Sequence, residues 1–234
     1  MNYVGIAIGS TCAKTAVFNE QKELMFTDVQ PTGWSSVDTA EEIRKKLESA
    51  GISLEEGACV ATGYGRVSVP YADKMITEIT CHAKGAVWLT GEKNVAVIDI
   101  GGQDVKGIAV DKDGTVKNFA MNDKCAAGTG KFYEAMARAF EMELPEFSRL
   151  SLKAKNVIPI TAQCTVFAES EVISHIGSGE RREDIAAGVV ESVVKRVAGL
   201  VSRDAVKGRL VLTGGLSECD YVIKSLSQKL SLLH

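Results

Sequence analysis

An internal repeat at a spacing of 92 residues constrains the fold of this 234-residue chain more than any other feature. The segment Ala7–Lys14 aligns with the segment Asp99–Lys106, and the match continues without a gap through residues 16–19 and 108–111. In both copies an apolar run meets a turn of small residues, and a second apolar run follows. Each copy therefore predicts a β-hairpin, because glycine allows the tight turn that joins two antiparallel strands.

The remaining apolar patterns predict an α/β fold. Strands are expected at Tyr3–Ile8, Ala16–Phe18, Val95–Ile100, Val105–Val110, Val157–Ile160 and Leu210–Leu212. A helix is expected from Thr39 to Ala50, capped by Ser36 or Asp38 and ended by Gly51, and a longer helix from Glu183 to Val206. The length of the chain suits one large domain or two small lobes, and with one hairpin in each half the lobes would fall at residues 1–92 and 93–234.

Charge and hydropathy argue against two classes of partner. The formal net charge is −3 and no basic tract stands out, so we expect no nucleic acid partner. No apolar run is long enough to cross a bilayer, and the first residues lack the pattern of a secretory signal. These features predict a cytoplasmic protein that does not enter the membrane.

The glycine turns predict a binding site for phosphate groups. Small residues let backbone N–H groups approach phosphate oxygens, and hydroxyl groups add further donors. The candidate nucleotide-binding residues are Gly9, Ser10, Thr11, Gly101, Gly102, Gln103, Gly128, Thr129, Gly130, Gly214 and Gly215. The repeat also pairs Lys14 with Lys106, and either lysine could contact phosphates or lie in solvent on its hairpin.

Two catalytic roles are expected at the second turn. Asp99 precedes the turn and could hold Mg²⁺ through water, and Gln103 could orient an attacking water molecule. The repeat places Ala7 opposite Asp99, so the first hairpin lacks the matching carboxylate. The sequence therefore predicts nucleotide binding and leaves the hydrolysis of ATP open, because the metal would have one ligand fewer.

Two of the six cysteines, Cys125 and Cys164, each stand directly before a helical pattern. A thiolate at a helix N-terminus is stabilised by free N–H groups and by the helix dipole. Two thiolates cannot complete the usual four-ligand set of a [4Fe–4S] cluster, whereas a symmetric homodimer would supply four. On the residues alone, a zinc site across a dimer and two buried structural cysteines remain open alternatives.

Several longer strings carry a family resemblance. They are ATGYGR (61–66), ADK (72–74), CHAKGA (81–86), VIDIGGQDVK (97–106), FAMNDKCAAGTGKF (119–132) and CTVFAESEVISHI (164–176). Together with the glycine turns, they resemble the activators of 2-hydroxyacyl-CoA dehydratases and the ATPase subunits of benzoyl-CoA reductases, within the actin-like ATPase superfamily. The resemblance extends from the N-terminus to Gly215.

The resemblance implies two lobes that close on ATP or ADP with Mg²⁺. It implies that Cys125 and Cys164 of each protomer hold one [4Fe–4S] cluster per homodimer. It further implies that a reduced ferredoxin or flavodoxin supplies an electron and that a 2-hydroxyacyl-CoA dehydratase-type partner receives it. Members of the family continue after the Gly214-Gly215 element with a further strand and helix, so this return element is expected to be short or missing here.

Two other functions remain open. A nucleotide-binding regulator or scaffold with impaired ATP hydrolysis would account for Ala7 and for the short C-terminus. A small-molecule kinase of the same superfamily would share the phosphate-binding turns but would leave the two cysteine strings unexplained.

Overall fold

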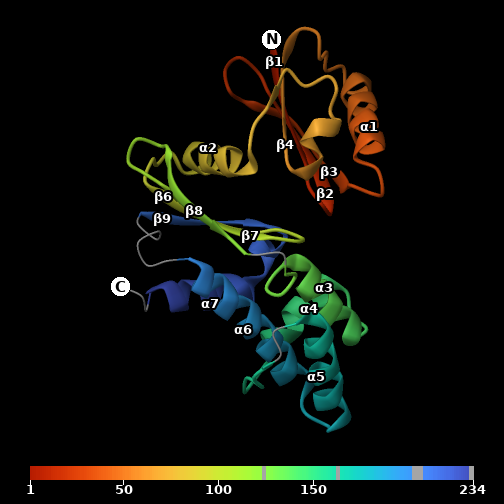
Figure 1. The fold of residues 1–234 in the computed structure, drawn as a ribbon, viewed down its shortest axis with the longest axis vertical. Helices are drawn as coiled ribbons and strands as arrows, with labels where there is room; N and C mark the ends of the chain where they lie inside the picture. The colour runs from red at the N-terminus through yellow and green to blue at the C-terminus, as the bar shows by residue number, and fades with distance from the viewer. Residues whose placement is uncertain (123–124, 162–163, 202–207, 232–234) are drawn as a thin grey trace. The chain divides into compact units, whose positions relative to one another are not determined.

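The computed structural model describes residues 1–122, 125–161, 164–201 and 208–231. The chain divides into two compact units, Met1–His82 and Ala83–His234, and the division falls within helix α2 (Glu78–Thr90). Each unit is built on its own mixed sheet (Figure 1). The expected boundary at residue 92 lies just after the same helix.

The first unit contains a five-stranded sheet in the order β3-β2-β1-β4-β5. Its strands are β1 (Asn2–Ile8), β2 (Cys12–Phe18), β3 (Leu24–Pro31), β4 (Gly57–Thr62) and β5 (Lys74–Met75). The first three strands are antiparallel neighbours, whereas β4 runs parallel to β1, and β5 runs parallel to β4. Alternate residues of β1 from Val4 to Ile8 are buried with the apolar face of helix α1 (Ser36–Ser49), as the period of a strand requires.

Helix α1 begins and ends with local capping interactions. The side chain of Ser35 accepts a hydrogen bond of 3.2 Å from the N–H of Asp38, so Ser35 is the N-cap in place of the expected Ser36 or Asp38. The predicted end of the helix is confirmed, because Gly51 follows the C-cap with a φ of +74°.

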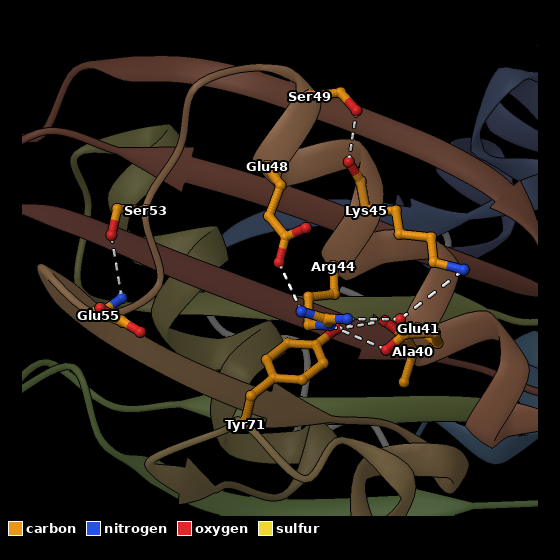
Figure 2. Close-up of polar contacts among 9 residues, drawn as sticks. All are labelled: Ala40, Glu41, Arg44, Lys45, Glu48, Ser49, Ser53, Glu55 and Tyr71. Atoms are coloured by element: carbon orange, nitrogen blue, oxygen red, sulfur yellow. Dashed lines mark hydrogen bonds and ion pairs between the residues drawn. The ribbon is translucent and has the colours of Figure 1, made fainter.

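Polar contacts attach α1 to its neighbours and run along its exposed side (Figure 2). Tyr71 donates a hydrogen bond of 2.6 Å to the carbonyl of Ala40, which joins the loop before β5 to the helix. Burial raises the pKa of Tyr71, so its hydroxyl keeps its proton and remains a donor. On the solvent side Arg44 bonds to Glu41 at 2.6 Å and to Glu48 at 2.7 Å, and such exposed pairs add little stability.

The second unit contains a four-stranded sheet in the order β8-β7-β6-β9. The strands are β6 (Val95–Ile100), β7 (Val105–Val110), β8 (Val116–Met121) and β9 (Arg209–Gly214), and only β9 is parallel to its neighbour β6. Helix α6 packs against this sheet and the other helices pack around α6 (Figure 1). The helices are α3 (Gly130–Ala139), α4 (Leu144–Ser151), α5 (Thr165–Gly177), α6 (Arg182–Leu200) and α7 (Asp220–Ser231). A short 3-10 helix at Tyr64–Ser68 follows β4, and another at Gly215–Glu218 follows β9.

The predicted strand at Val157–Ile160 is wrong. This segment forms no strand, and the N–H of Ile158 instead donates to the carbonyl of Asp184 in α6 at 3.1 Å. A Cβ atom at Gly188 would lie 1.7 Å from the carbonyl oxygen of Ile158, so glycine permits this close approach of backbone to helix. A short apolar run that packs on a helix has the same composition as a buried strand, which explains the error.

The other expected elements are confirmed. The expected strands Ala16–Phe18 and Leu210–Leu212 lie inside the longer strands β2 and β9. The long helix expected from Glu183 begins at Arg182 and ends at Leu200, and the expected residues 202–206 lie outside the described residues. Within the described ranges, no helix combines the length and the apolar character needed to cross a bilayer.

Candidate functional site

The two units repeat one hairpin, and the alignment at a spacing of 92 residues is confirmed. Ala7 pairs with Lys14 across β1 and β2, and Asp99 pairs with Lys106 at the same register position across β6 and β7. Paired residues of antiparallel strands point to the same face of the sheet. Each pair therefore places its two side chains beside the glycine turn of its own unit.

Both glycine turns are closed by the same backbone hydrogen bond. The N–H of Gly9 donates to the carbonyl of Cys12 at 3.1 Å, and the N–H of Gly101 donates to the carbonyl of Asp104 at 2.9 Å. In the first turn the buried Thr32 adds a bond of 2.7 Å from its Oγ1 atom to the carbonyl of Gly9. Thr32 was not predictable from the sequence, because a residue 23 positions from its partner belongs to no local motif.

The repeat extends to a third strand that the sequence analysis did not align. This strand is β4 in the first unit and β9 in the second, and each runs parallel to the first strand of its hairpin. Strand β4 ends at Thr62 and Gly63 follows it, whereas β9 ends with Thr213 and Gly214. Gly63 has a φ of +89° and Gly214 has a φ of +87°. An added Cβ atom would lie 2.3 Å from the carbonyl oxygen of Ile8 at Gly63, and 2.2 Å from that of Ile100 at Gly214. Both positions therefore require glycine.

At the second turn a buried network joins one lysine to two carboxylates. The Nζ atom of Lys106 lies 2.7 Å from Oδ1 of Asp104 and 3.3 Å from Oδ2 of Asp99. Thr213 donates a hydrogen bond of 2.9 Å from Oγ1 to Oδ1 of Asp99. The Lys106 side chain is only 3% exposed, so it does not lie in solvent, and the two acids offset the cost of burying its charge. Gln103 is exposed in the turn.

In the first unit, the residues at the equivalent register positions are Lys14, Ala7 and Thr62. This row of three residues lacks the network. Lys14 is exposed, and Ala7 stands between Lys14 on β2 and Thr62 on β4 without offering a carboxylate to either. The buried Oγ1 atom of Thr62 has no hydrogen-bond partner. Ser10 and Thr11 form the middle of this turn, where both are partly buried. The first turn therefore presents a cationic side chain, whereas the lysine of the second turn is already paired with acids.

The predicted segment Gly128–Gly130 lies against the second turn. The N–H of Gly130 donates to the carbonyl of Gly101 at 2.8 Å, and the N–H of Lys131 donates to the carbonyl of Gly102 at 2.9 Å. These are the first amides of α3, which a helix leaves without internal partners. Since they bond to the turn, the geometry favours a role for this segment in supporting the turn.

The two predicted cluster ligands, Cys125 and Cys164, are the two cysteines that the structure leaves exposed. Cys164 is the N-cap residue of α5. Cys125 precedes α3, and its carbonyl accepts a hydrogen bond of 2.9 Å from Nδ2 of Asn122. Cys59 and Cys219 are buried instead, and burial raises the pKa of the Cys59 thiol to about 11. The alternative of Cys125 and Cys164 as two buried structural cysteines is therefore wrong.

The ligand groups of the described residues do not complete a metal site within one chain. Among the described residues, no group of three or more histidine, cysteine, aspartate or glutamate side chains could hold a metal ion. Next to Cys164, the first-turn side chains Val166 and Phe167 of α5 are 67% and 69% exposed. Exposed apolar side chains that lie together are typical of surfaces that contact another protein.

Two mixed sheets that carry the same hairpin, each with a parallel strand and a threonine-glycine pair, define an actin-like ATPase fold. Component A of (R)-2-hydroxyglutaryl-CoA dehydratase from Acidaminococcus fermentans matches with a TM-score of 0.91 and 40% identity, over 99% of this chain and 89% of that chain. An activator of 2-hydroxyisocaproyl-CoA dehydratase from Clostridium difficile with bound ADPNP matches with a TM-score of 0.90 and 36% identity, over 99% and 86% of the two chains.

The chain belongs to the BadF/BadG/BcrA/BcrD ATPase family, whose model matches residues 4–232. The activator of lactoyl-CoA dehydratase from Anaerotignum propionicum is 42% identical over 228 residues, which cover 97% of this chain and 88% of that relative. The α/β fold and the family resemblance inferred from the glycine and cysteine strings are therefore confirmed.

Proposed function

We propose that this protein is an ATP-dependent activator that passes an electron to a 2-hydroxyacyl-CoA dehydratase-type partner. The relatives described above are activators or components of such dehydratases, and one of them binds the nucleotide ADPNP. The observation that carries the proposal is the exposure of the thiols. Of six cysteines, the two predicted cluster ligands, Cys125 and Cys164, are the two that are exposed.

Cys125 and Cys164 of two copies of the chain would together hold one [4Fe–4S] cluster, which supplies one-electron chemistry when bound. The residues fit this group, because both thiols are exposed and Cys164 lies at the N-terminus of a 13-residue helix whose dipole favours a cluster of net negative charge. A second copy is needed for four ligands, and the exposed Val166 and Phe167 offer it an apolar surface. A reduced ferredoxin or flavodoxin is the expected electron donor.

The glycine turns would bind ATP or ADP. Lys14 is exposed beside the first turn and would contact phosphate oxygens as a charged donor. Asp99 would hold Mg²⁺ through water at the second turn, where its carboxylate is oriented by Thr213. Gln103 is exposed in the same turn and would orient the attacking water.

Iron and acid-labile sulfide analysis after anaerobic purification tests the proposal. We expect about two iron and two sulfide per protomer, because one four-iron cluster would be shared by two chains. Cys125→Ser and Cys164→Ser should each lose the iron, whereas Cys81→Ser, at a partly buried cysteine outside the predicted ligands, should retain it. Full iron in both ligand variants, or none in the anaerobically reconstituted wild type, would contradict the proposal.

A second candidate function, a nucleotide-binding regulator of the same fold with slow hydrolysis, is favoured by one observation. Ala7 stands where the second unit has Asp99, and the hydroxyl of its neighbour Thr62 is buried without a partner. Steady-state ATPase rates of the wild type, Ala7→Asp and the uncharged control Ala7→Asn separate the two functions. A gain of about tenfold or more in Ala7→Asp alone supports the regulator, since a restored carboxylate would improve metal binding. An active wild type contradicts the regulator.

A further inference from the structure

The chain segment that contains Cys125 is bonded at its start to the strand that leaves the second glycine turn and at its end to the turn itself. At its start, the N–H of Asn122 donates to the carbonyl of Val105 at 3.1 Å, and the N–H of Val105 donates to Oδ1 of Asn122 at 2.7 Å. Val105 is the first residue of β7 after the turn. At the end of the segment, the first two amides of α3 donate to the carbonyls of Gly101 and Gly102.

The side chain of Asn122 also reaches Cys125. Its Nδ2 atom donates a hydrogen bond of 2.9 Å to the Cys125 carbonyl, while its Oδ1 atom accepts from Val105. One planar amide group therefore bonds to the strand on one side and to the cysteine on the other. The amide is rigid and Asn122 is partly buried, so a displacement of Val105 would move the backbone of Cys125.

The second cysteine is held by a different element. Thr161 donates to Oε1 of Glu171 from its N–H and from its hydroxyl, both at 2.9 Å, and Glu171 belongs to α5. Cys164 is the N-cap of the same helix. These bonds attach the Cys164 segment to α5, whereas the bonds of the Cys125 segment lead to the glycine turn.

We propose that Asn122 is a positioning residue that couples the conformation of the second glycine turn to the Cys125 thiol. The inference rests on the proposed function, in which this turn binds nucleotide and Cys125 is a cluster ligand. A nucleotide shifts a conformational equilibrium only through different affinities for the two conformations. A diphosphate and a triphosphate that favour different turn conformations will therefore place Cys125 differently, because the Asn122 side chain joins the strand that leaves the turn to the Cys125 carbonyl.

Thiol alkylation in the cluster-free protein tests this coupling. The rate of reaction with iodoacetamide is measured at Cys125 and Cys164 by peptide mass spectrometry, with MgADP, with MgADPNP and without nucleotide. In the wild type, the two nucleotides should give rates at Cys125 that differ by about fivefold, the lower range of allosteric coupling. At Cys164 the difference should stay below about twofold, because its segment is attached to α5.

Two variants remove the link in different ways. Asn122→Ala removes both side-chain bonds, whereas Asn122→Asp keeps the acceptor for Val105 and loses the donor to Cys125. In both, the nucleotide-dependent difference at Cys125 should fall below about twofold while nucleotide affinity is retained. Asn118→Ala is the matched control on β8, because the Asn118 side chain bonds only to the adjacent N–H of Phe119 among the hydrogen bonds described.

Calorimetric titration with MgADPNP separates the two claims. A wild type that does not bind this nucleotide overturns the proposed function, and the coupling with it. A wild type that binds it without any change in Cys125 reactivity overturns the coupling alone. A nucleotide effect of equal size in the wild type and in Asn122→Asp also overturns the coupling, because that variant keeps the strand contact and lacks the donor to the cysteine.

Discussion

Thr213 holds Asp99 through a hydrogen bond of 2.9 Å between their Oγ1 and Oδ1 atoms, and this bond is absent from the repeated row of the first unit. Thr62, at the equivalent position, neighbours Ala7, and its buried hydroxyl has no partner. A buried polar group without a partner costs about 1–3 kcal/mol. The first unit therefore retains the threonine of the row although the carboxylate that the threonine would bind is missing.

The effect on Tm of removing the Thr62 hydroxyl should change sign with the residue at position 7. Thr62→Val should raise the Tm of the wild type by about 2–4 °C, because it removes an unpaired polar atom at nearly constant shape. In an Ala7→Asp background, Thr62→Val should lower the Tm, because the new carboxylate would accept the hydrogen bond. Calorimetry of the four proteins forms a double-mutant cycle, and an effect of the same sign in both backgrounds would refute the comparison of the two rows.

The two lysines of the repeat should contribute differently to stability. Lys106→Met removes the ammonium group that contacts the two buried carboxylates Asp99 and Asp104, which should lower the free energy of unfolding by about 3–5 kcal/mol. Lys14→Met changes the exposed lysine at the same register position and should alter it by less than about 0.5 kcal/mol. Urea denaturation measures both, and equal losses would show that burial of the Lys106 network does not determine its contribution.

Two glycines of α6, Gly188 and Gly199, allow a test of the close approach of the segment 157–160 to this helix. At Gly188 an added Cβ atom would lie 1.7 Å from the carbonyl oxygen of Ile158, so Gly188→Ala should cost about 1–3 kcal/mol or more through forced backbone shifts. At Gly199 an added Cβ atom would meet none of the described residues within 4 Å, so Gly199→Ala should stabilise the helix by about 0.5–1 kcal/mol. Thermal unfolding of both variants should show opposite shifts, and destabilisation by both would argue against the steric explanation.

The carboxylate of Asp184 should make stability depend on pH. Backbone N–H groups of Asn156 and Lys155 donate to its Oδ1 atom at 3.1 and 2.8 Å and hold the pKa of this carboxyl below its usual range. When the folded-state pKa is lowered, the stabilisation is present above the unfolded-state pKa of about 4 and is lost as the pH falls through the folded-state value. The stability difference between wild type and Asp184→Asn should therefore be larger at neutral pH than in acid. Denaturant titrations at both pH values measure it, and a constant difference would exclude the charge as its source.

The hairpins were predictable because their signal is local. An apolar run, a glycine turn and a second apolar run lie within about 15 residues in each copy, as short antiparallel pairs require. The same signal fails for Val157–Ile160, where the partner is the surface of α6 at Gly188. Local composition indicates that such a run is buried, but it does not show whether a strand or a helix covers it.

The polar contacts of the site were less accessible from sequence. The repeat pairs Asp99 with Lys106, because both lie on one hairpin. The bond from Thr213 to Asp99 depends on where β9 joins the sheet, more than a hundred residues later in the chain. Thr32 and Asn122 were missed for the same reason, since their partners are set by tertiary packing and not by spacing.

In the duplicated hairpin, the backbone of the turn is the same in both units but the charge of the side chains beside it differs. Glycines and one closing hydrogen bond set the same turn in both units. Beside it, one unit presents the exposed ammonium group of Lys14, and the other presents one lysine against two carboxylates. One backbone template thus carries a net positive charge beside the turn in the first copy and a net negative charge in the second. The side chains beside the turn, and not its backbone, set this difference in charge.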